Sequence, residues 1–140
     1  ALACVRLLAV LMAGELADGQ PLPQALVPIP LHRARLRQRG FDQALELARP
    51  LARHLGIALR ADALRRVRAT QAQTRLDAAA RRRNLRGAFA VAPGHGLPPH
   101  VALVDDVMTT GATAHAAARA LLRAGVARVD VWACARVPPA

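Results

Sequence analysis

The stretch VALVDDVMTTGAT, residues 101–113, decides the fold that the sequence predicts. Four apolar residues are followed by two aspartates, a turn rich in hydroxyl groups and glycine, and an alanine-rich run with helical spacing. Buried strands of parallel sheets are continuous apolar runs of this kind, and they deliver polar groups where they end. The stretch therefore predicts a parallel strand over 101–104 that leads through a short loop into a helix over 113–124.

Helical and strand-like patterns alternate along the rest of the chain. The spacing of apolar residues predicts a helix over 41–55. Gly56 is placed to end this helix, and Pro50, opposite its apolar face, predicts a kink rather than a break. Short apolar runs predict strands at 25–29, 59–67, 88–91 and 129–133. Such alternation predicts an α/β fold with a largely parallel sheet of about five strands and flanking helices.

Finer features of these elements also follow from the sequence. The prolines around 25–29 favour an edge strand or a strand end over a central position. In the helix over 113–124, helical spacing separates an inward from an outward face. The inward residues are Ala114, Ala117, Ala118, Leu121 and Leu122, and the outward ones are His115, Arg119 and Arg123.

The paired aspartates and the turn after them suggest a sugar phosphate site. Asp105 and Asp106 can accept hydrogen bonds from a vicinal diol. The turn offers hydroxyls and backbone N–H groups to a phosphate at the helix N-terminus, and Gly111 permits a close approach of the backbone. The residues of this turn are Thr109, Thr110, Gly111, Ala112 and Thr113. A sugar 5-phosphate with free 2- and 3-hydroxyls satisfies both halves of the site.

A simpler interpretation of the same residues stays open, in which a threonine of the turn only caps the helix. The sequence excludes two other protein classes that carry paired acids near the end of a strand. Receiver domains also carry paired acids after a strand but depend on a downstream lysine, which this chain lacks. Haloacid-dehalogenase-like phosphatases need Asp-x-Asp, and Val107 stands where the second aspartate would be.

The charge of the chain is strongly positive, with a formal net charge of +11 from 20 basic and nine acidic residues. Every basic residue is arginine, which excludes a Walker A loop and Schiff-base chemistry. Arginine clusters attract phosphates and nucleic acids, although a coding bias explains part of the charge equally well. Aromatic residues make up 2% of the chain, which argues against the stacking platforms of single-strand binders.

The amino-terminal residues are apolar but do not suggest a membrane span. Arg6 and Glu15 leave an uninterrupted run of eight residues between them, far short of the roughly 20 that a span requires. An amphipathic helix followed by a linker, over 1–24, is the better prediction. Cys4 and Cys134 form no CxxC pair, so neither a zinc ribbon nor a disulfide framework is indicated, and a cytoplasmic setting is expected.

The thirteen residues 101–113 resemble the ribosyl-5-phosphate signature of type I phosphoribosyltransferases. Three further segments resemble, in the same order and spacing, the ComF competence-associated branch of that family: VPIPLHRARLRQRGFDQA at 27–44, RVRATQAQTRL at 66–76 and RRRNLRGAF at 81–89. The resemblance covers about 27–137. Asp42 and Ala80 depart from the family pattern, where asparagine and an acid are usual. The zinc ribbon that precedes this region in full-length members has no counterpart here, which predicts a truncated or reduced version.

The resemblance implies a type I phosphoribosyltransferase-like domain over 25–137, with 1–24 in the place of part of the variable hood. It also implies binding of 5-phosphoribosyl 1-diphosphate with Mg²⁺, which is held through the ligand. Asp105 and Asp106 would lie near the ribose and are the candidate protein contacts of the ion. A nucleophile would displace pyrophosphate from ribose C1 through an oxocarbenium-like transition state. Arg35, Arg37 and Arg39 are the candidates for binding the pyrophosphate, although each also has an ordinary explanation as a solvated surface residue.

No general base and no acceptor can be assigned from the sequence. Purine-salvage relatives commonly carry an acid where Thr109 stands, and a threonine cannot act as a base at neutral pH. Three functions therefore stay open: a phosphoribosyltransferase, a competence-accessory protein that uses the ribose-phosphate site as a sensor and works through protein partners, and a basic nucleic-acid-binding module. No membrane partner is expected, and an oligomer is compatible with the sequence.

Overall fold

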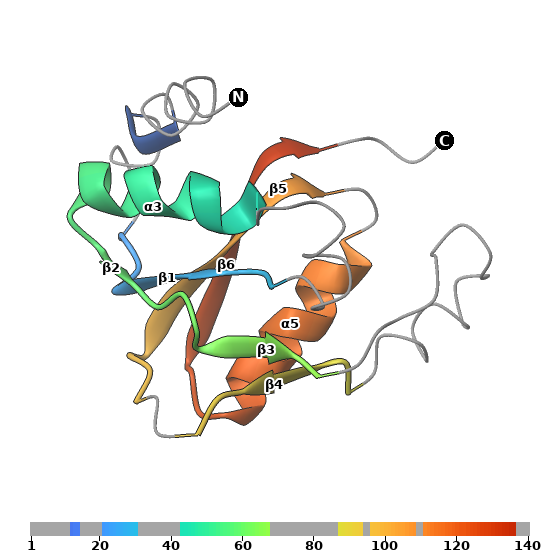
Figure 1. The fold of residues 1–140 in the computed structure, drawn as a ribbon. Coiled ribbons are helices and arrows are strands. Elements are labelled where there is room, and N and C mark those ends of the chain that lie inside the picture. The colour runs from blue at the N-terminus through green and yellow to red at the C-terminus, as the bar shows by residue number, and fades with distance from the viewer. Residues whose placement is uncertain are drawn as a thin grey trace.

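The computed structural model describes residues 12–14, 21–30, 43–67, 87–93, 96–108 and 111–136. These residues form a layered α/β arrangement with one long helix on each face of a sheet (Figure 1). Among them, no helix has the length and apolar character needed to cross a bilayer. The elements are β1 (Ala25–Pro28), α3 (Gln43–Leu55), β2 (Ala58–Leu59), β3 (Leu64–Arg66), β4 (Phe89–Val91), β5 (His100–Met108), α5 (Ala112–Arg123) and β6 (Arg128–Arg136).

The main sheet has four strands in the order β2-β1-β5-β6, and each neighbouring pair is parallel. From β1 the chain passes through α3 to β2 on one side, and from β5 it passes through α5 to β6 on the other side. The central neighbours β1 and β5 therefore send their connections in opposite directions. Ligands of open α/β sheets bind beyond the carboxyl ends of the strands at such a switch point.

Two apolar cores lie on the two faces of this sheet, because successive residues of a strand face opposite sides. On one face, Ala25 and Val27 of β1 and Val101 and Leu103 of β5 pack against α5. On the other face, Leu26, Ala102 and Val104 pack against α3, together with Ala13. The four β5 residues 101–104 are fully buried, which explains the continuous apolar run in the sequence.

A separate antiparallel pair, β3 and β4, joins the core on the α5 side. Leu64 and Phe89 are its buried residues, and they belong to the same cluster as the α5 core. The guanidinium carbon of Arg66 lies 5.3 Å from the centre of the Phe89 ring, so the aromatic face holds a cation. This pair covers part of the α5 side of the molecule and does not extend the main sheet.

The α/β class and the parallel pairing predicted from the sequence are confirmed, while several details differ. In the described residues the main sheet has four strands, and the segment expected to be one strand over 59–67 is divided between β2 and β3. The two strands belong to different sheets, so the chain turns at 60–63. β1 is a central strand; its prolines are tolerated because Pro28 is its last residue. β5 continues through both aspartates to Met108, four residues beyond its predicted end.

Both long helices were predicted, but the burial of one residue in each was predicted wrongly. Gly56 follows α3 with φ +68°, as expected for a glycine that ends a helix. Pro50 is buried, not on the solvent side, and α3 continues through it. In α5, Leu122 is 47% exposed although its spacing suggested an inward position, whereas Ala120 is buried. His115, Arg119 and Arg123 are exposed, as predicted. The proposed domain boundary at residue 24 stays a prediction.

Candidate functional site

The candidate site lies where the carboxyl ends of β1 and β5 meet. Pro28, the last residue of β1, is the register partner of Val104 in β5. The backbone N–H of Ile29 donates to the Val104 carbonyl at 2.9 Å, which ties the chain leaving β1 to β5. Asp105 follows Val104 directly and is the register partner of Ala133 in β6. The predicted ribose-binding residue Asp105 therefore lies at the switch point of the sheet.

The alternation of β5 determines which side of the sheet Asp105 occupies. Val101 and Leu103 are buried against α5, and Asp105 is the next residue of that alternating series. Unlike those two residues, Asp105 is only partly buried. Its position is therefore on the α5 side, at the point where the α5 core gives way to solvent.

The start of α5 supplies the second half of the site. Gly111 is the N-cap residue, with a left-handed backbone (φ +81°, ψ 0°), and no side chain caps the helix. The Gly111 carbonyl accepts the first helical hydrogen bond, from His115 N at 2.8 Å. Thr113 lies inside the first turn and is partly buried, so it does not cap α5. The capping interpretation fails for Thr113.

The direction of α5 brings its N-terminus to the same edge as Asp105. Because β5 and β6 are parallel neighbours joined by α5, the helix must run back along the sheet from the carboxyl edge. Ala114, Ala117 and Leu121 are buried and fix the helix against the sheet. A carboxylate that accepts hydrogen bonds and a helix N-terminus that attracts anions thus occupy one side of one edge.

The remaining candidate residues lie partly or wholly outside the described residues. Asp106 is the next residue of β5, but its side chain is not part of the description. Thr109 and Thr110 of the turn lie outside it, as do Arg35, Arg37 and Arg39. In the sequence, the last three lie between β1 and α3. Ala112 is the first residue of α5.

A polar cluster that the sequence did not reveal lies at the opposite, amino edge of the sheet. His100 and Arg128 begin β5 and β6 and are register partners. A 2.8 Å hydrogen bond joins His100 Nε2 to Asp130 Oδ2, and Arg128 Nε donates to Asp130 Oδ1 at 3.1 Å. The His100 N–H donates to Gln24 Oε1 at 3.2 Å. His100 is the first residue of β5, one residue before the start of the strand predicted over 101–104.

The electrostatics of this cluster centre on Asp130. Partial burial raises the pKa of its carboxyl group, but the hydrogen bonds from His100 and Arg128 and the charges of both residues outweigh burial. The pKa of Asp130 is therefore lowered from its ordinary value. An aspartate between two valines in the predicted strand 129–133 was the one sequence signal that a partner was needed.

No group of three or more His, Cys, Asp or Glu side chains in the described part of the chain is arranged to hold a metal ion. The chemistry that the described site offers is therefore hydrogen-bond acceptance at Asp105 and anion binding at the α5 N-terminus. A ligand that carries a diol and an anionic group matches these two features.

Several curated proteins are similar to this chain. The DNA utilization protein YhgH of Salmonella typhi is 46% identical over 137 residues, which are 97% of this chain and 59% of that protein. The protein of the same name from Escherichia coli (strain K12) is 42% identical over the same shares. Competence protein F of Haemophilus influenzae is 41% identical over 117 residues, which are 82% of this chain and 51% of that protein. No protein family model matches the chain.

The chain spans little more than half the length of these relatives. The matches extend over 97% of this chain for the first relative and over 82% for Competence protein F. Over the length that it spans, the chain therefore belongs to the ComF-type family, whose relatives are named for competence and for DNA utilization.

Proposed function

We propose that the chain binds 5-phosphoribosyl 1-diphosphate with Mg²⁺ at the β1–β5 edge and transfers the phosphoribosyl group, in the service of DNA utilization. In this proposal the fold is of the type I phosphoribosyltransferase kind. The relatives named for competence and DNA utilization support the biological setting. The chemistry rests on the site itself, because fold and family alone do not specify a reaction.

One observation carries the proposal: Asp105 and the N-terminus of α5 occupy the same side of the same sheet edge. The Asp105 carboxylate can accept hydrogen bonds from the ribose hydroxyls. The N–H groups at the start of α5 can bind the 5-phosphate, assisted by the left-handed Gly111 that admits a close approach. Asp106, Thr109, Thr110, Ala112 and Thr113 complete the proposed ribose and phosphate contacts.

In the proposed reaction the bond from ribose C1 to the pyrophosphate oxygen breaks, and C1 bonds to a nucleophilic acceptor that loses its proton. Positive charge develops on the ribose, and negative charge develops on the departing pyrophosphate. Arg35, Arg37 and Arg39 would stabilise the pyrophosphate through guanidinium hydrogen bonds. The Asp105 carboxylate would lie on the ribose side, where it favours the oxocarbenium-like charge.

Mg²⁺, bound through the oxygens of the ligand, would neutralise charge on the leaving pyrophosphate. Asp105, at this edge, would face the ribose hydroxyls and help to hold the sugar of the ligand that carries the ion. No residue is assigned as a general base. Of the described histidines, His54 and His100 lie at the opposite edge, and His115, in the first turn of α5, is exposed to solvent.

Isothermal titration calorimetry, in which phosphoribosyl diphosphate is added to the protein in the presence of MgCl₂, tests the proposal. The Asp105→Asn variant should bind about ten- to a hundredfold more weakly, because hydrogen bonds to a charged acceptor contribute about 1.5–3 kcal/mol. Asp62→Asn is the matched control, since Asp62 is exposed between β2 and β3. Equal affinity of the Asp105→Asn variant and the unmodified chain, or no binding by a folded unmodified chain, would contradict the proposal.

Turnover separates an enzyme from a sensor. Release of pyrophosphate, measured with a panel of nucleobases as acceptors, is the result that transferase activity requires. Tight binding without pyrophosphate release from any acceptor would leave the ribose-phosphate site in place and replace the reaction by a sensing role in a competence-accessory protein.

A further inference from the structure

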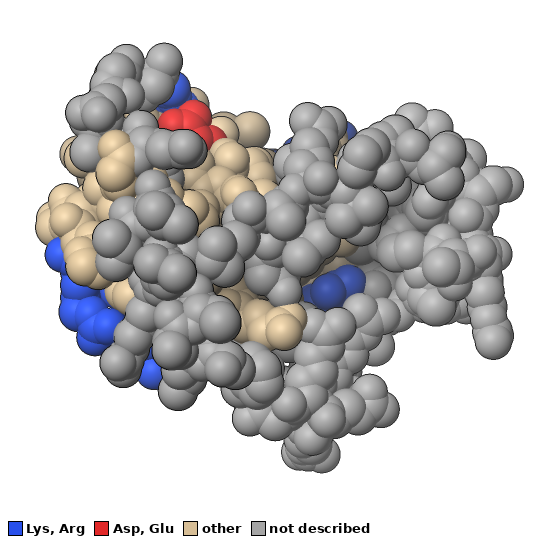
Figure 2. Space-filling view, turned by 90° about the horizontal axis from the view of Figure 1, so that it is seen from above, with Lys and Arg blue, Asp and Glu red and all other residues tan. Residues whose placement is uncertain are grey.

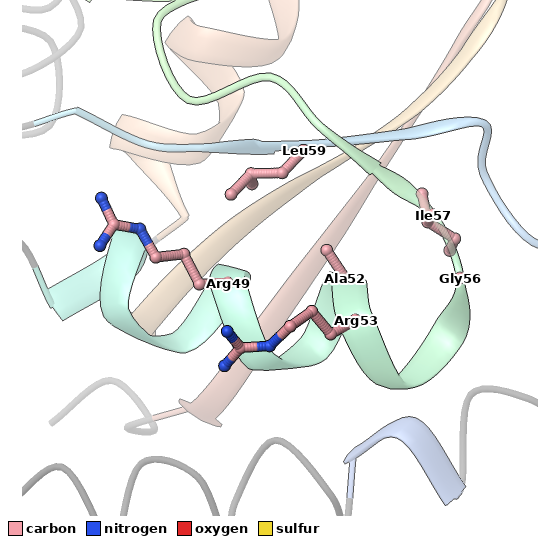
Figure 3. Close-up of a pocket in the computed structure, with 6 residues that line it drawn as sticks. All are labelled: Arg49, Ala52, Arg53, Gly56, Ile57 and Leu59. Atoms are coloured by element: carbon pink, nitrogen blue, oxygen red, sulfur yellow. The ribbon is translucent and has the colours of Figure 1, made fainter.

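A hollow on the α3 side of the molecule, outside the site described above, has the character of a peptide-binding surface. It is an open depression of about 460 Å³ between the last turns of α3 and strand β2. Figure 3 shows two arginine side chains of α3 extending along its rim, with Ile57 and Leu59 on the other side. The residues that line it are Arg49, Ala52, Arg53, Gly56, Ile57 and Leu59.

The rim of the hollow is positive. Arg49 and Arg53 are both exposed and are one turn apart on α3, so they lie side by side. Arg49 has only a long ion pair with Glu46, at 4.0 Å, and Arg53 has no ion-pair partner within the described part of the chain. Seen from above, arginine side chains gather on one side of the described surface (Figure 2). Two neighbouring guanidinium groups are suited to bind carboxylates.

The floor of the hollow is apolar and borders an edge strand. Ala52, Ile57 and Leu59 supply aliphatic surface, and the last two also pack against the α3 core. β2 pairs with β1 on one side, and no described strand pairs with its other side. The backbone N–H of Arg60 donates to the Leu26 carbonyl at 2.9 Å. Because neighbouring residues of a strand point their N–H and C=O groups to opposite sides, those of Leu59 face the open edge. An extended peptide can bind such an edge through its main chain.

We propose that this hollow binds an acidic peptide segment of a partner protein, with carboxylates on Arg49 and Arg53 and a bulky aliphatic side chain on the Ile57–Leu59 floor. Nucleic acid fits less well, because the described residues that line the hollow provide two cations and an apolar floor but no aromatic ring for a base to stack on. A second copy of this chain fits less well too, since two molecules of net charge +11 repel each other.

The test is fluorescence anisotropy with a labelled synthetic peptide in which consecutive aspartates precede one leucine. Arg53→Glu should weaken binding by about tenfold or more, because attraction becomes repulsion at the rim. Arg119→Glu is the matched control: Arg119 is also exposed, but on α5 at the other face of the sheet. It changes the net charge by the same amount and should alter the affinity by about twofold at most.

The peptide itself carries a second control. Replacing its leucine by serine should weaken binding about tenfold, because the burial of an aliphatic side chain is lost. Equal weakening by the two charge reversals, or equal binding of the serine peptide, would overturn the proposal in favour of general attraction to the basic chain. Tighter binding of an oligodeoxynucleotide that is also weakened by Arg53→Glu would assign the hollow to nucleic acid instead.

The proposal is independent of the function proposed for the β1–β5 edge. Arg53 is exposed, so the Arg53→Glu variant should keep its far-ultraviolet circular dichroism spectrum and its phosphoribosyl diphosphate titration. The neutral variant Arg53→Gln provides a second test in which no repulsion is introduced. On a logarithmic scale, it should weaken peptide binding about half as much as Arg53→Glu does. Unchanged peptide affinity in both variants would contradict the proposal whatever the titration shows.

Discussion

Gly111 precedes α5 and Gly125 follows it, and both have positive φ angles, +81° and +106°. Alanine at either position should destabilise the protein by about 1–2 kcal/mol, because an L-residue is strained there. A Cβ at Gly125 would meet no atom within 4 Å, so the cost at that position is backbone strain alone. Only Gly111→Ala should also weaken binding of phosphoribosyl diphosphate, since only Gly111 begins the helix at the candidate site.

Urea unfolding and calorimetric titration of the two glycine variants measure these effects. Similar losses of stability with a selective loss of affinity in Gly111→Ala are expected. If Gly125→Ala lost affinity to the same extent, the loss would come from general destabilisation and not from the approach of a phosphate to the backbone.

At the amino edge of the sheet, Asp130 should make stability depend on acid pH. Its native pKa is lower than the unfolded value of about 3.9, so its contribution is fully present above that value. The contribution is lost as the pH falls through the lower native pKa. Asp130→Asn should cost about 1–2 kcal/mol at pH 7, because hydrogen bonds from His100 and Arg128 lose their charged acceptor.

Denaturant midpoints measured from pH 7 down to pH 2 test the role of Asp130. The difference in stability between the unmodified chain and Asp130→Asn should shrink as the pH falls below the unfolded pKa of about 3.9, because the unfolded carboxyl is then protonated first. It should be lost once the native carboxyl, whose pKa is lower, is protonated as well. A difference that stays constant through this range would show that the variant acts through packing rather than through the carboxylate charge.

At the scale of the element, α5 shows which buried positions the spacing of apolar residues predicts correctly and which it does not. Leu121 is fully buried, whereas its neighbour Leu122 is 47% exposed. Leu121→Ala should cost about 2–4 kcal/mol, because a cavity remains in the α5 core. Leu122→Ala should cost about 0.5 kcal/mol or less. Thermal or urea unfolding of the two variants distinguishes them, and equal losses would mean that Leu122 also belongs to the core.

Spacing predicted α5 but not the width of its buried face. The pattern is compatible with several helix rotations, and the actual one depends on what lies opposite the helix. β4 packs on α5, and Ala120 is buried in the same cluster as Phe89 of β4. Pro50 of α3 was misplaced for a similar reason. It was assigned to solvent because it falls outside the main apolar stripe, but it is buried on a second side of α3.

Strands were predicted best where they are buried on both faces. The run 101–104 identified β5, because a fully buried parallel strand is apolar at every position. Its continuation to Met108 was missed, since the two aspartates interrupt the apolar run although β6 still pairs beyond Asp105. The boundary between β2 and β3 was missed as well, because arginine-rich short strands have no clear period.

At the scale of the whole molecule, the two candidate binding surfaces lie on opposite sides of the sheet, one on the α5 side and one on the α3 side. The α5 side carries Asp105 and the helix N-terminus at the carboxyl edge, and the α3 side carries the arginine-rimmed hollow beside β2. The sequence predicted a site on the first surface, since Asp105 and the residues that begin α5 are close together along the chain. It did not reveal the second, because Arg49 and Leu59 are ordinary residues until α3 and β2 are placed side by side.

The resemblance to the ComF-type family was recognised from short motifs and is confirmed by the relatives. Sequence reasoning could not establish the acceptor or a general base, since both depend on side chains that converge only in the folded protein. The pairing of β1 with β5, which places the end of one strand beside Asp105 of the other, is likewise a property of the tertiary structure.

The most direct test of the central claim is an NMR titration of the isotopically labelled chain with phosphoribosyl diphosphate and Mg²⁺. Backbone amide signals of Asp105 and of residues 111–114 should shift together and saturate at one ligand per chain, while signals from Arg53 and Ile57 beside the hollow stay in place. Saturable shifts confined to the α3 side, or none at any concentration that keeps the chain folded, would contradict a ribose-phosphate site at the β1–β5 edge.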